Sequence, residues 1–507
     1  MLSKVFSAAV VGLDAQIIEV EVDASYGLRH FEIVGLPDKA VQEARERVGA
    51  AIESSGFQSP HHQPIRVLVS LAPADLKKEG ALYDLPIALG FLLADGKINF
   101  SPENRVFVGE LALDGRLRPI KGALSFAIVC REKGISELIL PKENAIEAGL
   151  IEEIKVIGAE SLREVIDYLQ GKKTISPKKT GPENFLKTFN YPIDLGYIKG
   201  QESSKRALEI AAAGGHHLLM MGPPGAGKTL LAKAIPSILP QLSFEESLEI
   251  TKIYSIAGLL PKNRPLINLR PFRSPHHTSS EVALIGGGNP PRPGEITLAH
   301  RGVLFLDEFP EFHRDVLESL RQPIEEGQIT VLRAKHSLTL PARFTLVAAS
   351  NPCPCGNFGD PEKECKCTNS QIRMYRRKLS GPLMDRIDLF INVPSLKYEK
   401  LVAIDEENYS AKVRERVEKA RQIQKERFKK QKTNSEMEIP QIKKYCQVDS
   451  SSESLLREAV NSGKLSARGY HRVLKVSRTI ADLERLENIS YQNLSEALAY
   501  RLREEGQ

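Results

Sequence analysis

The sequence predicts an α/β protein built around a parallel sheet. Three segments support this prediction, at residues 218–221, 303–306 and 344–350. Each is an apolar run with the length of a buried strand; the first leads into a glycine-rich loop that ends in Lys228 and Thr229, and the other two are followed directly by polar residues. Because parallel strands present their carboxyl ends at one edge of a sheet, we expect these polar residues to form a site there.

The first segment runs into a glycine-rich loop of the form G-x-x-x-x-G-K-T and then into a helical stretch. Loops of this form turn backbone N–H groups toward nucleotide phosphates. Lys228 is placed to reach the β and γ oxygens, and the Thr229 hydroxyl is placed to ligate Mg²⁺. The sequence therefore predicts a site for ATP and Mg²⁺ formed by Gly222, Pro223, Pro224, Gly225, Ala226, Gly227, Lys228 and Thr229.

Polar residues after the other two segments complete this site. Asp307 is expected to hold Mg²⁺ through water, and Glu308 to polarise the water that attacks the γ-phosphate. The amide of Asn351 is suited to orienting that water or to sensing the γ-phosphate. Since a carboxylate in the position of Glu308 separates a hydrolase from a nucleotide switch, we expect ATP hydrolysis.

This order of motifs resembles an AAA+ ATPase core, and among such cores it is similar to the magnesium chelatase and MCM branch. Over nearly the whole chain the match is closest to the bacterial ComM/YifB family. Residues 379–389 resemble the family's arginine-finger segment, with Arg386 at the position that reaches a neighbouring subunit's γ-phosphate. Taken alone, Arg386 could also form a local pair with an aspartate at a helix end.

Two further segments carry the resemblance. Residues 465–472 are similar to the second-sensor helix of a helical lid, with Arg468 the better match for the γ-phosphate contact and Arg472 a close competitor. Residues 327–340 form two alternating strands around a basic turn and resemble a hairpin that points into the pore of a ring. There Arg333, Lys335 and His336 would contact DNA phosphates, unless they only keep an exposed edge soluble.

Residues 1–170 predict an α+β domain, with strand-like runs at 17–22 and 65–69 and a helix over 39–54. Residues 108–120 resemble the proteolytic domain of Lon peptidases, which implies the fold of ribosomal protein S5 domain 2. The position of the nucleophilic serine in Lon falls on Ile87, and that of its lysine on Phe126. Neither side chain can attack a carbonyl or accept a proton, so we expect no peptidase activity.

Composition and length support several domains in an ordinary globular protein. The chain has 507 residues and 41% apolar residues, and we expect the domain at 1–170, a Pro- and Lys-rich linker at 171–184, an ATPase core at 185–395 and a helical lid at 396–507. With neither a signal peptide nor a long apolar span, a cytoplasmic location and no membrane partner are expected.

The mild net charge of +6 says little about partners, but its distribution is uneven. Residues 411–432 hold ten Lys or Arg against three Glu, an excess of seven positive charges. A helix of this kind either projects into solvent or contacts nucleic acid.

Four of the six cysteines cluster directly after Asn351, at Cys353, Cys355, Cys365 and Cys367. In a cytosolic chain this pattern favours a structural zinc site, although two C-x-C pairs are tighter than the usual C-x-x-C and free thiols are the alternative. The adjacent His276 and His277 favour structural hydrogen bonding over joint metal ligation.

The resemblance implies a hexameric, ATP-driven DNA helicase. It would promote branch migration during homologous recombination in natural transformation, with single-stranded or branched DNA and recombination proteins as partners. The alternative is a chelatase-type or chaperone-like ATPase that remodels a protein partner.

Overall fold

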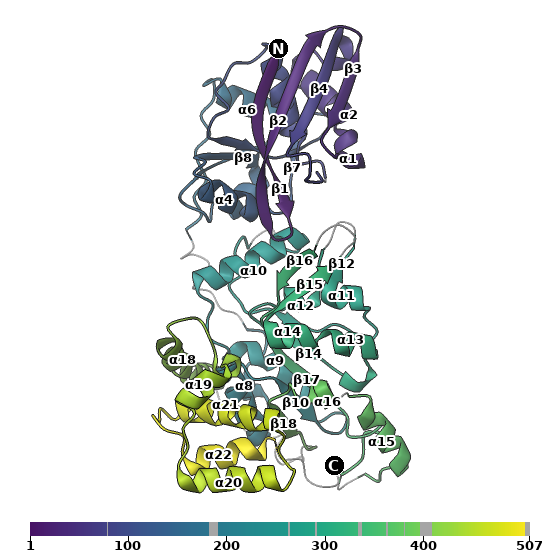
Figure 1. Ribbon diagram of the computed structural model, residues 1–507. Helices are drawn as coiled ribbons and strands as arrows, with labels where there is room; N and C mark the ends of the chain where they lie inside the picture. The colour runs from purple at the N-terminus through teal and green to yellow at the C-terminus, as the bar shows by residue number, and fades with distance from the viewer. Residues whose placement is uncertain are drawn as a thin grey trace. The chain divides into compact units, whose positions relative to one another are not determined.

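The computed structural model describes residues 1–78, 80–181, 191–261, 264–288, 292–332, 337–360, 363–379, 381–395 and 408–501 (Figure 1). It divides into two compact units. The first comprises Met1–Thr188, Ser247–Ile267 and Asn289–Arg292, and the second comprises Phe189–Glu246, Asn268–Gly288 and Pro293–Gln507. Among the described residues, no helix is both long and apolar enough to cross a membrane. The predicted α/β fold class is confirmed.

The first unit contains a mixed four-stranded sheet in the order β1-β2-β4-β3. Strands β1 and β2 form an antiparallel hairpin, whereas β3 runs parallel to β4. The inward side chains Val20 and Val22 are fully buried, as period-two alternation requires. The strands of this sheet are β1 (Leu2–Val11), β2 (Asp14–Tyr26), β3 (His30–Val34) and β4 (Ile65–Ala72).

A parallel sheet in the order β5-β8-β9 and several helices complete the first unit. Ile87 on α3 and Phe126 on α4 are both fully buried, so these positions serve the apolar core. The remaining strands are β5 (Arg105–Phe107), β6 (Glu110–Leu111), β7 (Leu117–Arg118), β8 (Glu137–Pro141) and β9 (Lys155–Ala159). The helices are α1 (Lys39–Gln42), α2 (Ala44–Ser54), η1 (Pro60–His62), α3 (Asp84–Ala94), α4 (Ala123–Glu132), α5 (Lys142–Ala148) and α6 (Leu162–Leu169).

From Ser247 onward, α10 (Phe244–Ala257) belongs to the first unit, although it lies in the sequence expected for the ATPase core. The backbone N–H of Gly122 donates to the Ser255 hydroxyl at 3.0 Å, and Ser255 donates to the Glu147 carboxylate. Burial raises the pKa of Glu147 despite these hydrogen bonds. The expected domain boundaries remain predictions. This segment shows that a compact unit can include residues that are not continuous with the rest of that unit in the sequence.

The second unit is built on a five-stranded parallel sheet in the order β11-β14-β17-β10-β18. Leu218 pairs with Val347 on one side and with Leu389 on the other, so β10 is an interior strand between β17 and β18. All four residues of β14 and all six of β17 are buried, which explains their near-continuous apolar sequence. The strands are β10 (Leu218–Met221), β11 (Phe272–Arg273), β14 (Val303–Leu306), β17 (Thr345–Ser350) and β18 (Leu389–Asn392).

The second unit also contains an antiparallel hairpin, short strands and helices. Strands β15 (Gln328–Leu332) and β16 (Ser337–Pro341) pair as the sequence predicted, with Gln328 opposite Pro341. The short strands are β12 (Gly286–Gly287) and β13 (Arg292–Pro293). The helices are η2 (Leu195–Tyr197), α8 (Glu202–Gly214), α9 (Lys228–Ile238), α11 (Glu281–Ile285), α12 (Glu295–Leu298), η3 (Phe309–Glu311), α13 (Arg314–Ser319), α14 (Arg321–Glu326), α15 (Asn369–Arg377) and α16 (Gly381–Met384).

The carboxyl-terminal part of the second unit is helical. Its elements are α18 (Tyr409–Phe428), η4 (Asn434–Glu436), α19 (Ile439–Tyr445), α20 (Ser450–Asn461), α21 (Ala467–Leu483) and α22 (Tyr491–Ala499) (Figure 1). The predicted basic helix is α18, and its arginines mostly hold it in place. Arg414 donates to the Ser237 carbonyl at 3.2 Å, Arg416 pairs with Glu209 at 2.5 Å, and Arg421 donates to the Ala212 carbonyl. The packing therefore favours the structural interpretation of these charges.

Candidate active site

The glycine-rich loop joins β10 to α9 and has the backbone that such a loop requires. Gly225 and Gly227 have φ angles of 80° and 89°, in the left-handed region that glycine tolerates best. At Gly222 the requirement is space, because a Cβ there would lie 2.2 Å from the Val393 carbonyl oxygen. Since α9 begins at Lys228, its unpaired first-turn N–H groups face this loop. The loop therefore forms an anion-binding turn.

Lys228 contacts both the loop and the end of β17. Its ammonium donates to the carbonyls of Gly222 at 2.7 Å and Pro223 at 2.9 Å, and to Oδ1 of Asn351 at 3.2 Å. Burial lowers the pKa of Lys228, and nearby Asp307 partly offsets this effect. The structure thus brings together residues that are 123 positions apart in sequence.

Thr229 and Asp307 form the oxygen-rich part of the site. The Thr229 hydroxyl donates to Oδ2 of Asp307 at 2.7 Å, and Oδ1 of Asp307 accepts from the Glu308 N–H at 3.0 Å. A hydroxyl and a carboxylate side by side are ligands that suit Mg²⁺. The residues present therefore fit ATP with Mg²⁺, which when bound would neutralise phosphate charge.

Glu308 is held by a partner that the sequence analysis did not assign to the site. Its backbone is left-handed, with φ 51° and ψ 45°, and its carboxylate lies 3.1 Å from Nδ1 of His277. The His277 ring also packs on His276, with ring centroids 4.2 Å apart. Because β11 pairs parallel to β14, residues that follow β11 reach the same sheet edge as Glu308. The strand pairing is needed to place His277 beside Glu308, because two adjacent histidines in a sequence do not indicate such a contact.

The two family-derived arginines occupy different environments. Arg386 is buried, pairs with Oε1 of Glu325 at 2.6 Å and donates to the Pro382 carbonyl. Arg468 on α21 is exposed, and among the described residues it has no hydrogen-bond or ion-pair partner. Its competitor Arg472 donates to the buried Asp388 instead. Of these two arginines, Arg472 is therefore held by Asp388, whereas the Arg468 side chain is unpaired within the described part of the chain.

A buried polar network joins the start of β10 to α21. Asp388 accepts from the His217 N–H at 3.1 Å, lies 3.3 Å from Nδ1 of His216 and pairs with Arg472. The second ring nitrogen of His216 lies 2.8 Å from the Thr479 hydroxyl. Burial alone would raise the pKa of Asp388, but Arg472 and His216 hold it well below its usual range. The sheet and the helical part are thus joined by charged hydrogen bonds.

This network predicts a pH-dependent stability. Burial lowers the pKa of His217 from 6.5 to about 4, so between these values the unfolded chain binds a proton that the folded chain does not. The stability from neutral His217 is complete above pH 6.5 and should fall toward pH 4 by up to about 3 kcal/mol. Urea unfolding across this range measures the slope, and His217→Gln, which cannot titrate, should reduce it. An identical slope in this variant would contradict the assignment.

The four cysteine sulfurs lie within 4.8 Å of one another. Sγ of Cys353 is 3.4 Å from that of Cys355 and 3.7 Å from that of Cys365. Tetrahedral zinc with Zn–S bonds of about 2.3 Å places its sulfurs about 3.8 Å apart, so the arrangement suits a four-thiolate metal site. Backbone N–H groups of Asn357 and Lys366 lower the pKa of the Cys355 thiol to about 6.

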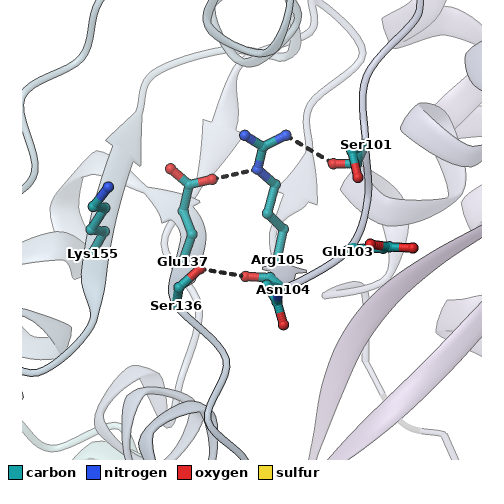
Figure 2. Close-up of a pocket in the computed structure, with 7 residues that line it drawn as sticks. All are labelled: Ser101, Glu103, Asn104, Arg105, Ser136, Glu137 and Lys155. Atoms are coloured by element: carbon teal, nitrogen blue, oxygen red, sulfur yellow. Dashed lines mark hydrogen bonds and ion pairs between the residues drawn. The ribbon is translucent and has the colours of Figure 1, made fainter.

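Arg333, Lys335 and His336, the predicted DNA contacts at the hairpin turn, lie outside the described residues. In the first unit a polar cavity of about 350 Å³ is lined by residues that include Arg105 and Glu137 (Figure 2). Arg105 donates to Oε2 of Glu137 at 2.6 Å and to the Ser101 carbonyl at 2.8 Å, so its charge is already paired.

Comparisons with known proteins agree with this architecture. The family model for magnesium chelatase subunit ChlI matches residues 194–401, a second ChlI model matches 20–144, and a ChlI carboxyl-terminal model matches 407–501. The chain is 43% identical over 508 residues to competence protein ComM of Haemophilus influenzae, covering 99% of this chain and 97% of that protein.

Two further relatives define the extent of the similarity. The YifB protein of Escherichia coli is 44% identical over 506 residues, covering 99% of this chain and 97% of YifB. The magnesium-chelatase 38 kDa subunit of Cereibacter sphaeroides is 27% identical over 177 residues, covering 32% of this chain and 53% of that subunit. With a phosphate loop, paired carboxylates and a parallel sheet in the matched region, the chain belongs to the ComM/YifB family of magnesium chelatase-like AAA+ proteins.

Proposed function

We propose that this chain is an ATP hydrolase that assembles into a hexameric ring and moves DNA. Its task would be helicase activity that promotes branch migration during homologous recombination in natural transformation. The observation that carries the proposal is the convergence of Lys228, Thr229, Asp307 and Asn351 at one sheet edge, next to Glu308. The DNA part rests on the relative called competence protein ComM, which covers 99% of this chain.

The site residues have separate roles in the proposed hydrolysis. Lys228 exchanges its loop carbonyls for phosphate oxygens, which are stronger acceptors because they carry charge. Thr229 and Asp307 hold Mg²⁺, while Asn351 orients the attacking water. Glu308 accepts a proton from that water as its oxygen bonds to the γ-phosphorus and the bond from that phosphorus to the bridging oxygen of the departing ADP breaks. The contacts of Lys228 and the Thr229–Asp307 pair support these roles.

Ring assembly would complete the site. In this proposal Arg386 leaves Glu325 and reaches the γ-phosphate of the neighbouring subunit, where it stabilises charge in the transition state. Glu325 is about half exposed, with 49% of its side chain accessible, so this pair lies at a surface that another subunit can approach. Arg468 contacts the γ-phosphate from the helical lid, and its exposure supports this role.

Two further assignments belong to the proposal. The residues at the hairpin turn, Arg333, Lys335 and His336, contact the DNA backbone inside the ring. The four cysteines hold a structural Zn²⁺, and the spacing of their sulfurs supports this assignment.

The alternative is an ATPase that remodels a protein partner. The similarity to magnesium-chelatase subunits, which covers about a third of the chain, supports this alternative. Steady-state ATP hydrolysis with no DNA, with single-stranded DNA and with a branched duplex separates the two, beside Lys228→Ala as the inactive control. DNA stimulation that is absent in the control supports the DNA motor. Turnover that is indifferent to every DNA favours the remodelling ATPase.

A further inference from the structure

The four-cysteine loop packs directly on the phosphate loop. Gly356 lies so close to Pro224 that a Cβ at Gly356 would be 2.5 Å from Cδ and 2.7 Å from Cγ of the proline ring. Such separations essentially do not occur between a real Cβ and another heavy atom, so the backbone at Gly356 leaves no room for a side chain beside the Pro224 ring. The position of Gly356 in the cysteine loop therefore limits where Pro224 can lie.

The cysteines determine the position of Gly356. Its N–H donates to the Cys353 carbonyl at 3.0 Å, and the Phe358 N–H donates to Sγ of the fully buried Cys353 at 3.3 Å. The Arg376 guanidinium lies 5.1 Å from the centre of the Phe358 ring, which ties the loop to α15. Gly356 thus lies in a tight turn. Cys353 holds the start of this turn, and the contact between Phe358 and Arg376 fixes the residues that follow it.

The residues just before the cysteines hold the two ends of the phosphate loop. The Gly222 N–H donates to the Ser350 carbonyl at 3.2 Å, and Lys228 donates to Oδ1 of Asn351 at 3.2 Å. Together with Pro224, three points of the phosphate loop contact the single segment 350–356. This continuous set of contacts joins the two candidate binding sites of the second unit.

We propose that the four-cysteine loop is a support for the phosphate loop, so that metal binding by the cysteines and nucleotide binding by residues 222–229 strengthen each other. The proposal rests on the ATP site proposed above. Metal bound to the four sulfurs holds residues 353–356 against Pro224, and this contact keeps the phosphate loop in its anion-binding shape. Because coupling between two binding sites is reciprocal, bound nucleotide should also retain the metal.

The test compares two alanine substitutions in the same loop. Gly356 and Gly359 have nearly equal φ angles of 84° and 79°, so alanine brings similar backbone strain at both. A Cβ at Gly356 meets Pro224, whereas a Cβ at Gly359 has no atom of the described residues within 4 Å. In the full-length chain, Gly356→Ala should weaken binding of a fluorescent ATP analogue by on the order of ten-fold or more, since ångström-scale misplacement is costly. Gly359→Ala should bind the analogue like the original chain.

A second measurement uses the unsubstituted chain and tests the coupling between metal binding and nucleotide binding even if Gly356→Ala does not fold. The zinc content is measured, the metal is removed with a chelator, and analogue binding is compared before removal, after removal and after Zn²⁺ is restored. Affinity that falls and recovers, with slower zinc release when the analogue is bound, supports the coupling.

Three outcomes overturn the inference, namely a chain that binds no zinc, affinity that does not depend on zinc, and equal affinities of the folded Gly356→Ala and Gly359→Ala variants. A zinc-loaded chain that binds no ATP analogue instead refutes the proposed ATP site, and this result is distinct because it concerns the unsubstituted protein.

Discussion

Replacing Glu308 by glutamine should lower kcat for ATP hydrolysis by about 100-fold or more while nucleotide remains bound. A glutamine amide cannot accept a proton from water, and a positioned general base contributes on the order of 10²–10⁴-fold to rate. Phosphate release gives kcat, and a fluorescent ATP analogue gives affinity. Glu311→Gln is the matched control, because Glu311 follows the same strand but pairs with Lys378 at 2.8 Å. Normal turnover in Glu308→Gln would remove Glu308 from the mechanism.

His277→Ala tests how Glu308 is positioned. His277 lies 3.1 Å from the Glu308 carboxylate and would act only through it. We therefore expect a lower kcat with little change in KM, and a smaller loss than that of Glu308→Gln. In the Glu308→Gln background, His277→Ala should have no additional effect on kcat. A full second loss in the double variant would mean that His277 acts independently.

Asp388→Asn is expected to destabilise the protein by about 3 kcal/mol or more, because it removes the buried counter-charge of Arg472 and a carboxylate that accepts hydrogen bonds within the buried network. Asp388 is only 2% exposed and contacts His216, His217 and Arg472. Urea unfolding at pH 7 measures the loss as a lower midpoint.

Asp385→Asn is the control for this loss. Its carboxylate is 42% exposed and lies 3.9 Å from Arg501, so the same change should cost about 1 kcal/mol or less. Equal midpoints for the Asp388 and Asp385 variants would show that the buried network contributes little to stability.

Local sequence was enough to predict the strands that hold the candidate site residues. The phosphate loop, the carboxylates after β14 and Asn351 after β17 lie where the strand patterns placed them. The strand positions could be predicted because a buried parallel strand has a characteristic apolar run, and because all such strands end at one edge of the sheet. The hairpin of β15 and β16 was predicted for a similar reason, since alternation has a period of two in the sequence itself.

Other features required the tertiary structure. Residues 247–267 lie in the first unit although their sequence neighbours lie in the second, and no local pattern marks this change. The arginines of α18 form a simple basic run in sequence, yet Arg414 and Arg421 donate to carbonyls of other elements. The hydrogen-bond partner of such an arginine depends on packing between segments some 200 residues apart in the chain.

The α/β class and the residue types of the candidate nucleotide site could be predicted from local sequence, because phosphate-binding loops and strand ends are local patterns. Tertiary structure alone decided that His277 holds Glu308, that Arg472 is taken by Asp388 and that Gly356 packs on Pro224. Each of these contacts joins segments that are distant in the chain, and their partners are selected by strand order and loop packing, which no single stretch of sequence specifies.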